Sequence, residues 1–220
     1  MADTVAFDVI GTLLSLDKAR AALTSIGAPD NTLPVWFGTS LRDYFAISHA
    51  GDYVPFARVL SADLRRALKE VGVDPADAAI DEVMGSLGRL DLNDGAKEAF
   101  DQLSAAGFQI VTLTNGSTEF TSAALERFGL RGVVAHVLSC DEIRVSKPHT
   151  RVYEMAKKVS EGEVWMVASH AWDIAGAALA GLRTVFVGAP SDYPEIFPPP
   201  EIVTPDLATA AKSIVATRGP

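Results

Sequence analysis

The chain has 220 residues, of which 48% are hydrophobic and 21% charged, and its formal net charge is −9. These values indicate a globular chain, and no apolar stretch is long enough to span a membrane. Because phosphate backbones are bound by basic surfaces, the acidic balance argues against a nucleic-acid partner. A small anionic substrate remains compatible, since the potential inside a pocket can oppose the net charge.

The cysteine content and the N-terminus indicate the compartment. Cys140 is the single cysteine, so an internal disulfide is excluded and a reducing environment is expected. The N-terminus lacks the basic region and apolar core of a signal peptide. We therefore expect a cytoplasmic protein.

The first 92 residues predict one strand followed by helices only. Residues 3–9 have the apolar pattern of a short buried strand. The apolar spacing that follows predicts helices over 17–26, 32–49, 55–71 and 74–87, with Pro75 in the first turn of the last one. An all-helical insert is therefore expected over residues 15–92.

From residue 93 onward, strands alternate with helices. Asn93 or Asp94 is expected to cap a helix that ends at Gly107, and residues 190–200 read as a proline-rich surface loop. Strands are expected at 108–113, 133–138, 164–168 and 184–187, and further helices at 117–128, 150–159, 172–180 and 205–216. The alternation predicts an α/β fold with a doubly wound parallel sheet in a core domain of residues 1–14 and 93–220. Residues 15–92 would form a cap over the carboxyl ends of the strands.

Four polar segments fall at or just beyond the ends of expected strands. A single Asp, hydroxyl or Lys residue at the end of a strand is usually a turn or helix-cap residue. Because the carboxyl ends of parallel strands share one edge of the sheet, the four together predict a common crevice. The segments are Asp8 to Thr12, Thr114 to Ser117, Ser146 to Pro148, and Ser169 to Asp173.

These segments resemble the motifs of the haloacid dehalogenase superfamily, and within it the L-2-haloacid dehalogenase branch. The resemblance covers nearly the whole chain and implies a Rossmann-like core with a helical cap, and a homodimer. It rests on Phe-Asp-Val-Ile-Gly-Thr-Leu (7–13), Leu-Thr-Asn-Gly-Ser (113–117), Val-Ser-Lys-Pro with Arg-Val-Tyr-Glu-Met-Ala (within 145–156), and Ala-Trp-Asp-Ile-Ala-Gly-Ala (171–177).

The resemblance implies hydrolysis of a carbon–halogen bond in a small 2-haloalkanoic acid. The Asp8 carboxylate would attack carbon and form an aspartyl ester, which water then hydrolyses. Lys147 would keep Asp8 ionised, and Asp173 would orient Lys147 or the hydrolytic water. Substrate contacts are expected from Thr12, Ile10, Thr114, Asn115, Phe37, Phe56, Tyr153, Ser169, His170 and Trp172.

A phosphatase of the same superfamily is the first alternative. Such enzymes place a second aspartate two residues after the nucleophile, where this chain has Ile10, and bind Mg²⁺ with a Gly-Asp in the last motif, where it has Ala168-Ser169. We therefore expect no metal and no cofactor; Mg²⁺ belongs only to the phosphatase alternative. A non-catalytic binding protein on the same scaffold is the second alternative.

The chain departs from the dehalogenase branch at two positions that serve the leaving halide. The arginine that follows a tryptophan in the branch's cap is Phe37 here, after Trp36. His170 stands where the branch has an asparagine. An altered substrate or low activity is therefore expected. Trp36, Leu41, Phe37, Phe56 and Trp172 are expected to line an apolar pocket over Asp8, or else to pack between cap and core.

Overall fold

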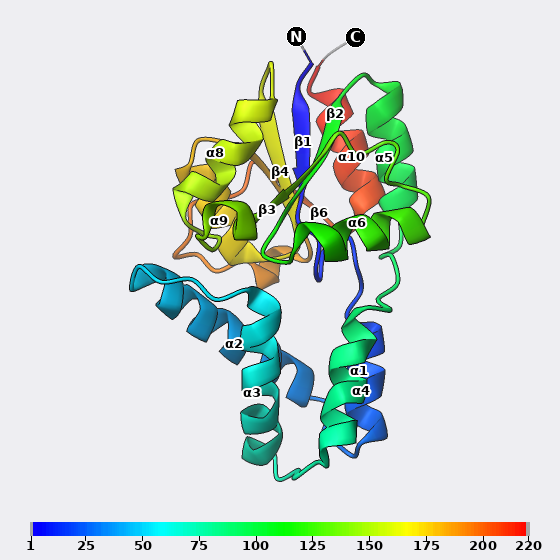
Figure 1. The fold of residues 1–220 in the computed structure, drawn as a ribbon. Coiled ribbons are helices and arrows are strands. Elements are labelled where there is room, and N and C mark those ends of the chain that lie inside the picture. Colours follow the sequence, from blue (N-terminus) through cyan, green and yellow to red (C-terminus); the bar gives the residue numbers. More distant parts are fainter. Residues whose placement is uncertain (1, 219–220) are drawn as a thin grey trace. The chain divides into compact units, whose positions relative to one another are not determined.

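The computed structural model describes residues 2–218, and the chain divides into two compact units. The α/β unit comprises the residues up to 14 and those from 92 onward, and the helical unit comprises 15–91 (Figure 1). No helix among the described residues combines the length and the apolar character needed to cross a membrane.

The α/β unit contains a six-stranded sheet in the order β3-β2-β1-β4-β5-β6, and every neighbouring pair is parallel. The strands are β1 (Thr4–Phe7), β2 (Gln109–Thr114), β3 (His136–Ser139), β4 (Val164–Ala168), β5 (Arg183–Val187) and β6 (Ile202–Thr204). The strand β1 lies between β2 and β4, where the order of the strands reverses, and Ala6 pairs with Val111 on one side and Met166 on the other. In open α/β sheets this reversal marks the ligand crevice.

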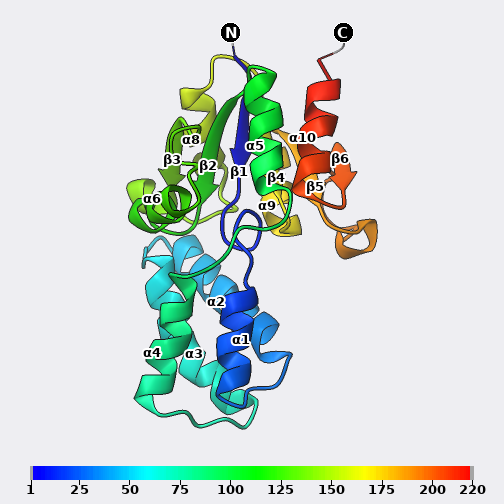
Figure 2. The same cartoon turned by 90° about the vertical axis from the view of Figure 1, so that its right-hand side faces the viewer.

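Helices cover both faces of the sheet, as the alternation of side chains along each strand requires (Figures 1 and 2). On one face Val5 and Phe7 join a core with α5 and α10; on the other, Ala6 and Met166 join a core with α8 and α9. The expected doubly wound parallel sheet is confirmed. The helices are α5 (Ala96–Ala105), α6 (Thr118–Arg127), α7 (Cys140–Ile143), α8 (Thr150–Val159), α9 (Ala171–Leu179) and α10 (Leu207–Ala216).

The start of α5 differs from the sequence-based prediction. Gly95, at φ +77°, precedes the helix, so neither Asn93 nor Asp94 caps it. The Asn93 side chain instead donates a hydrogen bond of 2.7 Å to the carbonyl oxygen of Thr12. That bond ties the start of α5 to the loop that follows β1.

The helical unit contains α1 (Asp17–Ser25), α2 (Thr32–His49), α3 (Phe56–Glu70) and α4 (Asp77–Leu87). The apolar face of α3 is buried, and the indole Nε1–H of Trp36 donates to the carbonyl oxygen of Leu60 at 2.8 Å, which joins α2 to α3. Pro75 lies outside α4, contrary to prediction, because the backbone of Ala76 is extended.

Three short elements escaped the sequence analysis. They are β6, α7 and a 3₁₀ turn at Pro190–Asp192 inside the expected proline-rich loop. The strand β6 is three residues long and depends on pairing with β5, where Phe186 lies opposite Val203. A segment of that length is too short to show a hydrophobic period of its own.

Candidate active site

Asp8 lies at the point where the strand order of the sheet reverses. It directly follows β1, and its backbone N–H donates to the carbonyl oxygen of Val167 on β4 at 3.0 Å. Ser169 and His170 follow β4, and Thr114 ends β2. The topology thus brings three of the four polar segments to the ends of adjacent strands.

Three side chains contact the two carboxylate oxygens of Asp8. Lys147 Nζ lies 3.1 Å from Oδ1, while the Thr12 hydroxyl donates to Oδ2 at 2.7 Å and His170 Nδ1 lies 3.0 Å from the same oxygen. The Thr12 oxygen accepts the backbone N–H of Ser169 at 2.9 Å, so its hydrogen is directed to Asp8. The carboxylate is therefore fixed on both sides.

The surroundings of Asp8 favour its ionised form. The side chain is almost fully buried, and burial alone would raise the pKa of Asp8. The Lys147 ammonium, together with the hydrogen bonds from His170 and Thr12, outweighs burial and holds the pKa of Asp8 well below its usual range. Asp8 is therefore a carboxylate that can act as a nucleophile at neutral pH.

Lys147 is held between two acids. Its Nζ lies 2.7 Å from Oδ2 of Asp173, and both side chains are fully buried. Burial would lower the pKa of Lys147, but the charges of Asp173 and Asp8 raise it. Burial and the nearby Asp8 raise the pKa of Asp173 in spite of Lys147. The environments of the two acids therefore shift their pKa values in opposite directions.

Tyr153 closes the far side of Asp173. Its hydroxyl donates to Oδ1 of Asp173 at 2.7 Å, and Tyr153 is fully buried. Both oxygens of Asp173 are thus engaged, one by Lys147 and the other by Tyr153. This arrangement supports orienting Lys147, of the two tasks expected for Asp173. The expected substrate contact of Tyr153 remains a prediction, and its observed contact is with Asp173.

The loop after β2 is fixed by hydrogen bonds. Oδ1 of Asn115 accepts the backbone N–H of Lys147 at 3.0 Å and the thiol of Cys140 at 3.2 Å. The Thr114 hydroxyl oxygen accepts the N–H of Gly116 at 2.9 Å, and the Ser139 hydroxyl donates to the Gly116 carbonyl oxygen at 2.7 Å. Sequence analysis missed the roles of Ser139 and Cys140, although both lie where a strand next to β2 ends.

Gly176 lies on α9, and the sequence analysis predicts no role for it. A Cβ atom there would lie 2.5 Å from the hydroxyl oxygen of Tyr153 and 2.6 Å from Cβ of Pro148. The missing side chain lets Tyr153 and the residue after Lys147 approach α9. Gly176 is thus a positioning residue that sequence analysis overlooked.

The remaining predicted contacts lie in different places. Ile10 lies beside Gly116, where an added Cβ would meet its Cδ1 at 3.4 Å, and the Trp172 ring stacks on His170 at a centroid distance of 5.2 Å. Phe37 and Phe56 belong to the helical unit, where their rings meet edge-on at 5.9 Å. Their expected place over Asp8 remains a prediction.

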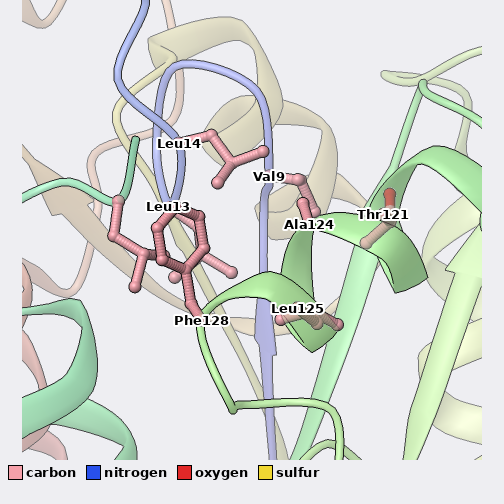
Figure 3. Close-up of a pocket in the computed structure, with 8 residues that line it drawn as sticks. Val9, Leu13, Leu14, Thr121, Ala124, Leu125 and Phe128 are labelled. Atoms are coloured by element: carbon pink, nitrogen blue, oxygen red, sulfur yellow. The ribbon is translucent and has the colours of Figure 1, made fainter. Parts of the chain in front are cut away.

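An apolar pocket lies beside the loop that follows Asp8 (Figure 3). That loop contributes three of the lining residues and α6 contributes most of the others. They are Val9, Leu13, Leu14, Leu92, Thr121, Ala124, Leu125 and Phe128. The lining carries one hydroxyl and no charge, so the pocket has no group for the chemistry of Asp8.

The protein-family model described as haloacid dehalogenase-like hydrolase matches residues 2–181. A (S)-2-haloacid dehalogenase of Burkholderia cepacia is 29% identical, over 86% of this chain and 84% of its own. A (S)-2-haloacid dehalogenase of Pseudomonas sp. (strain CBS-3) is 30% identical, over 85% of this chain and 86% of its own.

Solved structures agree with this match. A crystal structure described as that of a dehalogenase superposes with a TM-score of 0.88 at 27% identity and covers 96% of both chains. The L-2-haloacid dehalogenase of Xanthobacter autotrophicus, at 23% identity, has the same fold, with a TM-score of 0.85 over 100% of this chain and 99% of its own. The resemblance to the L-2-haloacid dehalogenase branch is thereby confirmed, and the chain belongs to the haloacid dehalogenase-like hydrolase family.

Proposed function

We propose that this chain hydrolyses the carbon–halogen bond of a small 2-haloalkanoic acid through an aspartyl ester on Asp8. The observation that carries the proposal is the buried Asp8 carboxylate, which Lys147 and Thr12 hold in its ionised form. The relatives named as (S)-2-haloacid dehalogenases support the substrate class.

In the first step, a carboxylate oxygen of Asp8 attacks the carbon that carries the halogen. A C–O bond forms, the C–X bond breaks, and the electron pair leaves with the halide. In the second step, water adds to the ester carbon of Asp8 and releases the hydroxy acid. A halide needs no proton in order to leave, and the residue two positions after Asp8 is the apolar Ile10. This environment suits a halide better than the oxygen of a phosphate ester.

The donor set near Asp8 does not fit a divalent cation. Mg²⁺ requires several hard oxygen ligands, usually including carboxylates. Asp8 and Asp173 both face the ammonium of Lys147, which lies where a cation between them would have to bind. Within residues 2–218 there is no cluster of three or more His, Cys, Asp or Glu that could hold a metal ion. We therefore propose a reaction without a metal.

The substrate carboxylate and the halide also need partners. Thr114, Asn115 and Ser169 lie at strand ends near Asp8 and are the proposed contacts of the anionic substrate. Arg42, the cation nearest in sequence to Phe37, is exposed and paired with Asp43 at 2.8 Å. With Phe37 in place of the branch's arginine, we propose an altered substrate, such as a different or smaller haloacid, or low activity.

The test is halide release from chloro-, bromo- and fluoroacetate and from both enantiomers of 2-chloropropionate. EDTA is present throughout, and Asp8→Asn is the control. The expected result is release by the wild type that EDTA does not abolish and that Asp8→Asn lacks. No release from any of the five acids would overturn the proposal. A screen of phosphate esters with Mg²⁺ would then test the phosphatase alternative. If no ester were hydrolysed, the result would favour a binding protein.

A further inference from the structure

We propose that His170 and Thr12 form a two-donor oxyanion site for Oδ2 of Asp8, and that Oδ1 is the oxygen that attacks carbon. The inference rests on the proposed dehalogenase function and assigns the two oxygens of its nucleophile. His170 then acts by donating a hydrogen bond from Nδ1.

The two oxygens of Asp8 have unequal surroundings. Oδ2 receives the Thr12 hydroxyl at 2.7 Å and His170 Nδ1 at 3.0 Å, while Lys147 Nζ contacts Oδ1 at 3.1 Å. Two donors on Oδ2 occupy the directions from which it would attack. Oδ1, with the ammonium on one side, keeps a lone pair for the carbon of the substrate.

The hydrogen positions follow from the network. Since Asp8 is ionised, its oxygens only accept hydrogen bonds, so Nδ1 of His170 carries the hydrogen whether the ring is neutral or charged. The Thr12 oxygen accepts from Ser169, so its own hydrogen goes to Oδ2. Both partners of Oδ2 are therefore donors.

The same donors serve the second step. In the ester, Oδ1 is bonded to the substrate and Oδ2 is the carbonyl oxygen. When water adds to the ester carbon, negative charge develops on Oδ2, where two preorganised donors already point. One proton of the water passes through Lys147 to Oδ1, and the Cγ–Oδ1 bond breaks to release the hydroxy acid. The second proton is lost to solvent when the Asp8 carboxylate re-forms.

General-base catalysis by His170 is less compatible with the geometry. The ring nitrogen at Asp8 is Nδ1, which already holds a hydrogen directed at Oδ2. The stacked Trp172 ring, at a centroid distance of 5.2 Å and an angle of 29°, keeps the imidazole plane in this orientation.

The proposal predicts a separation of the two steps. Donors to Oδ2 stabilise the free carboxylate and the tetrahedral intermediate, but they gain little from the uncharged ester. Loss of the His170 donor is therefore expected to leave ester formation unchanged or faster and to slow ester hydrolysis by about 10²- to 10³-fold. A purely structural defect would slow both steps.

The experiment compares wild type, His170→Ala and His170→Asn in rapid-quench turnover of bromoacetate, with halide release and intact-protein mass followed together. The expected result for His170→Ala is a burst of one halide per enzyme and accumulation of the ester. Asn keeps an N–H donor without the basicity of imidazole, so His170→Asn is expected to recover most of the hydrolysis rate. Equal hydrolysis defects in Ala and Asn variants, or slower ester formation, would overturn the assignment.

A second measurement remains informative if these variants fold poorly. Nitrogen-15 NMR of the four histidines in the wild type, assigned with His170→Asn, is expected to show a hydrogen on Nδ1 of His170. A ring with hydrogen on Nε2 alone would overturn the donor role without reference to activity. Failure of the wild type to release halide from any haloacid would instead overturn the proposed function, and the oxygen assignment with it.

Discussion

Lys147 Nζ lies 2.7 Å from Oδ2 of Asp173, and neither side chain is accessible to solvent. A buried pair of this kind is poor evidence of net stability, because desolvation offsets much of the attraction. What the pair does is fix the ammonium at 3.1 Å from Asp8. Asp173 thus acts on Asp8 through Lys147.

Replacement of Lys147 by Met leaves Asp8 and Asp173 buried with no cation between them. We expect Lys147→Met to lower the free energy of unfolding by about 3–5 kcal/mol, the range for breaking a buried pair, and to abolish halide release. Urea unfolding measures the first effect. The control is Lys212→Met on the exposed side of α10, which should change stability by less than about 0.5 kcal/mol. Equal stabilities of the two variants would contradict the buried charge network.

Sequence patterns predicted two elements of the α/β unit with their exact bounds. The helix at 150–159 and the strand at 164–168 match α8 and β4 residue for residue, because each is a strongly patterned segment with clear ends. Asn93 failed as a cap because its side chain makes a tertiary bond to Thr12 instead. Local propensity cannot anticipate a partner 81 residues away.

The sequence predicted where the site lies, at the carboxyl ends of the strands, but not all of the contacts within it. Topology and motif resemblance together selected Asp8, Lys147 and Asp173, and the structure brings these three side chains into contact; their catalytic roles remain proposals. The bonds of Tyr153 to Asp173 and of Cys140 to Asn115 were not predicted. They depend on how α7, α8 and α9 pack against their neighbours, which periodicity along one segment does not encode.

The opposite pKa shifts of Asp8 and Asp173 lead us to expect that the two carboxyl groups contribute to stability with opposite pH dependence. The pKa of Asp8 in the folded chain is below the usual 3.8, so ionised Asp8 stabilises the fold above pH 3.8 and this contribution is lost as the pH falls. The pKa of Asp173 is raised above 3.8, so its contribution has the other sign and is lost as the pH rises.

Urea unfolding of the wild type, Asp8→Asn and Asp173→Asn at a series of pH values below about 5 tests these signs. The stability difference between wild type and Asp8→Asn should shrink as the pH falls. The difference between wild type and Asp173→Asn should move in the opposite direction, in favour of the wild type. Parallel pH dependence of the two differences would show that the environments of the two acids are alike.

The close packing around Gly176 leads us to expect that one added methyl group will lower both the stability and kcat. A Cβ there would lie 2.5 Å from the Tyr153 hydroxyl and 2.8 Å from the carbonyl oxygen of Pro148, so Tyr153 or α9 must move. We expect Gly176→Ala to destabilise the fold by about 1–3 kcal/mol, as overpacking does, and to lower kcat through the displaced Asp173 and Lys147.

The matched control is Gly38→Ala, also in a helix but exposed on α2, with no atom within 4 Å of the added Cβ. Since Ala favours a helix over Gly by about 1 kcal/mol, this variant should be more stable than the wild type. Thermal unfolding of both variants measures the contrast. A stabilising Gly176→Ala would show that Tyr153 does not need the space beside α9.

Thr121 on α6 offers a stabilising change beside the loop of Asp8 (Figure 3). Its hydroxyl is fully buried in the lining of the apolar pocket and has no hydrogen-bond partner. A buried unpaired polar group costs about 1–3 kcal/mol, and valine has nearly the same shape. We expect Thr121→Val to raise the free energy of unfolding by about 1 kcal/mol.

The control for this change is Thr4→Val on β1, which is equally buried but donates its hydroxyl to Oε1 of Gln109 at 3.3 Å. Loss of the Thr4 hydroxyl should lower the free energy of unfolding, because Oε1 of Gln109 loses its donor. The same Thr-to-Val substitution is therefore expected to change the free energy of unfolding in opposite directions at the two positions. Urea unfolding of both variants measures these changes. If Thr121→Val were as destabilising as Thr4→Val, its hydroxyl would have to be bonded in solution, through water that enters the pocket beside Val9 and Leu13.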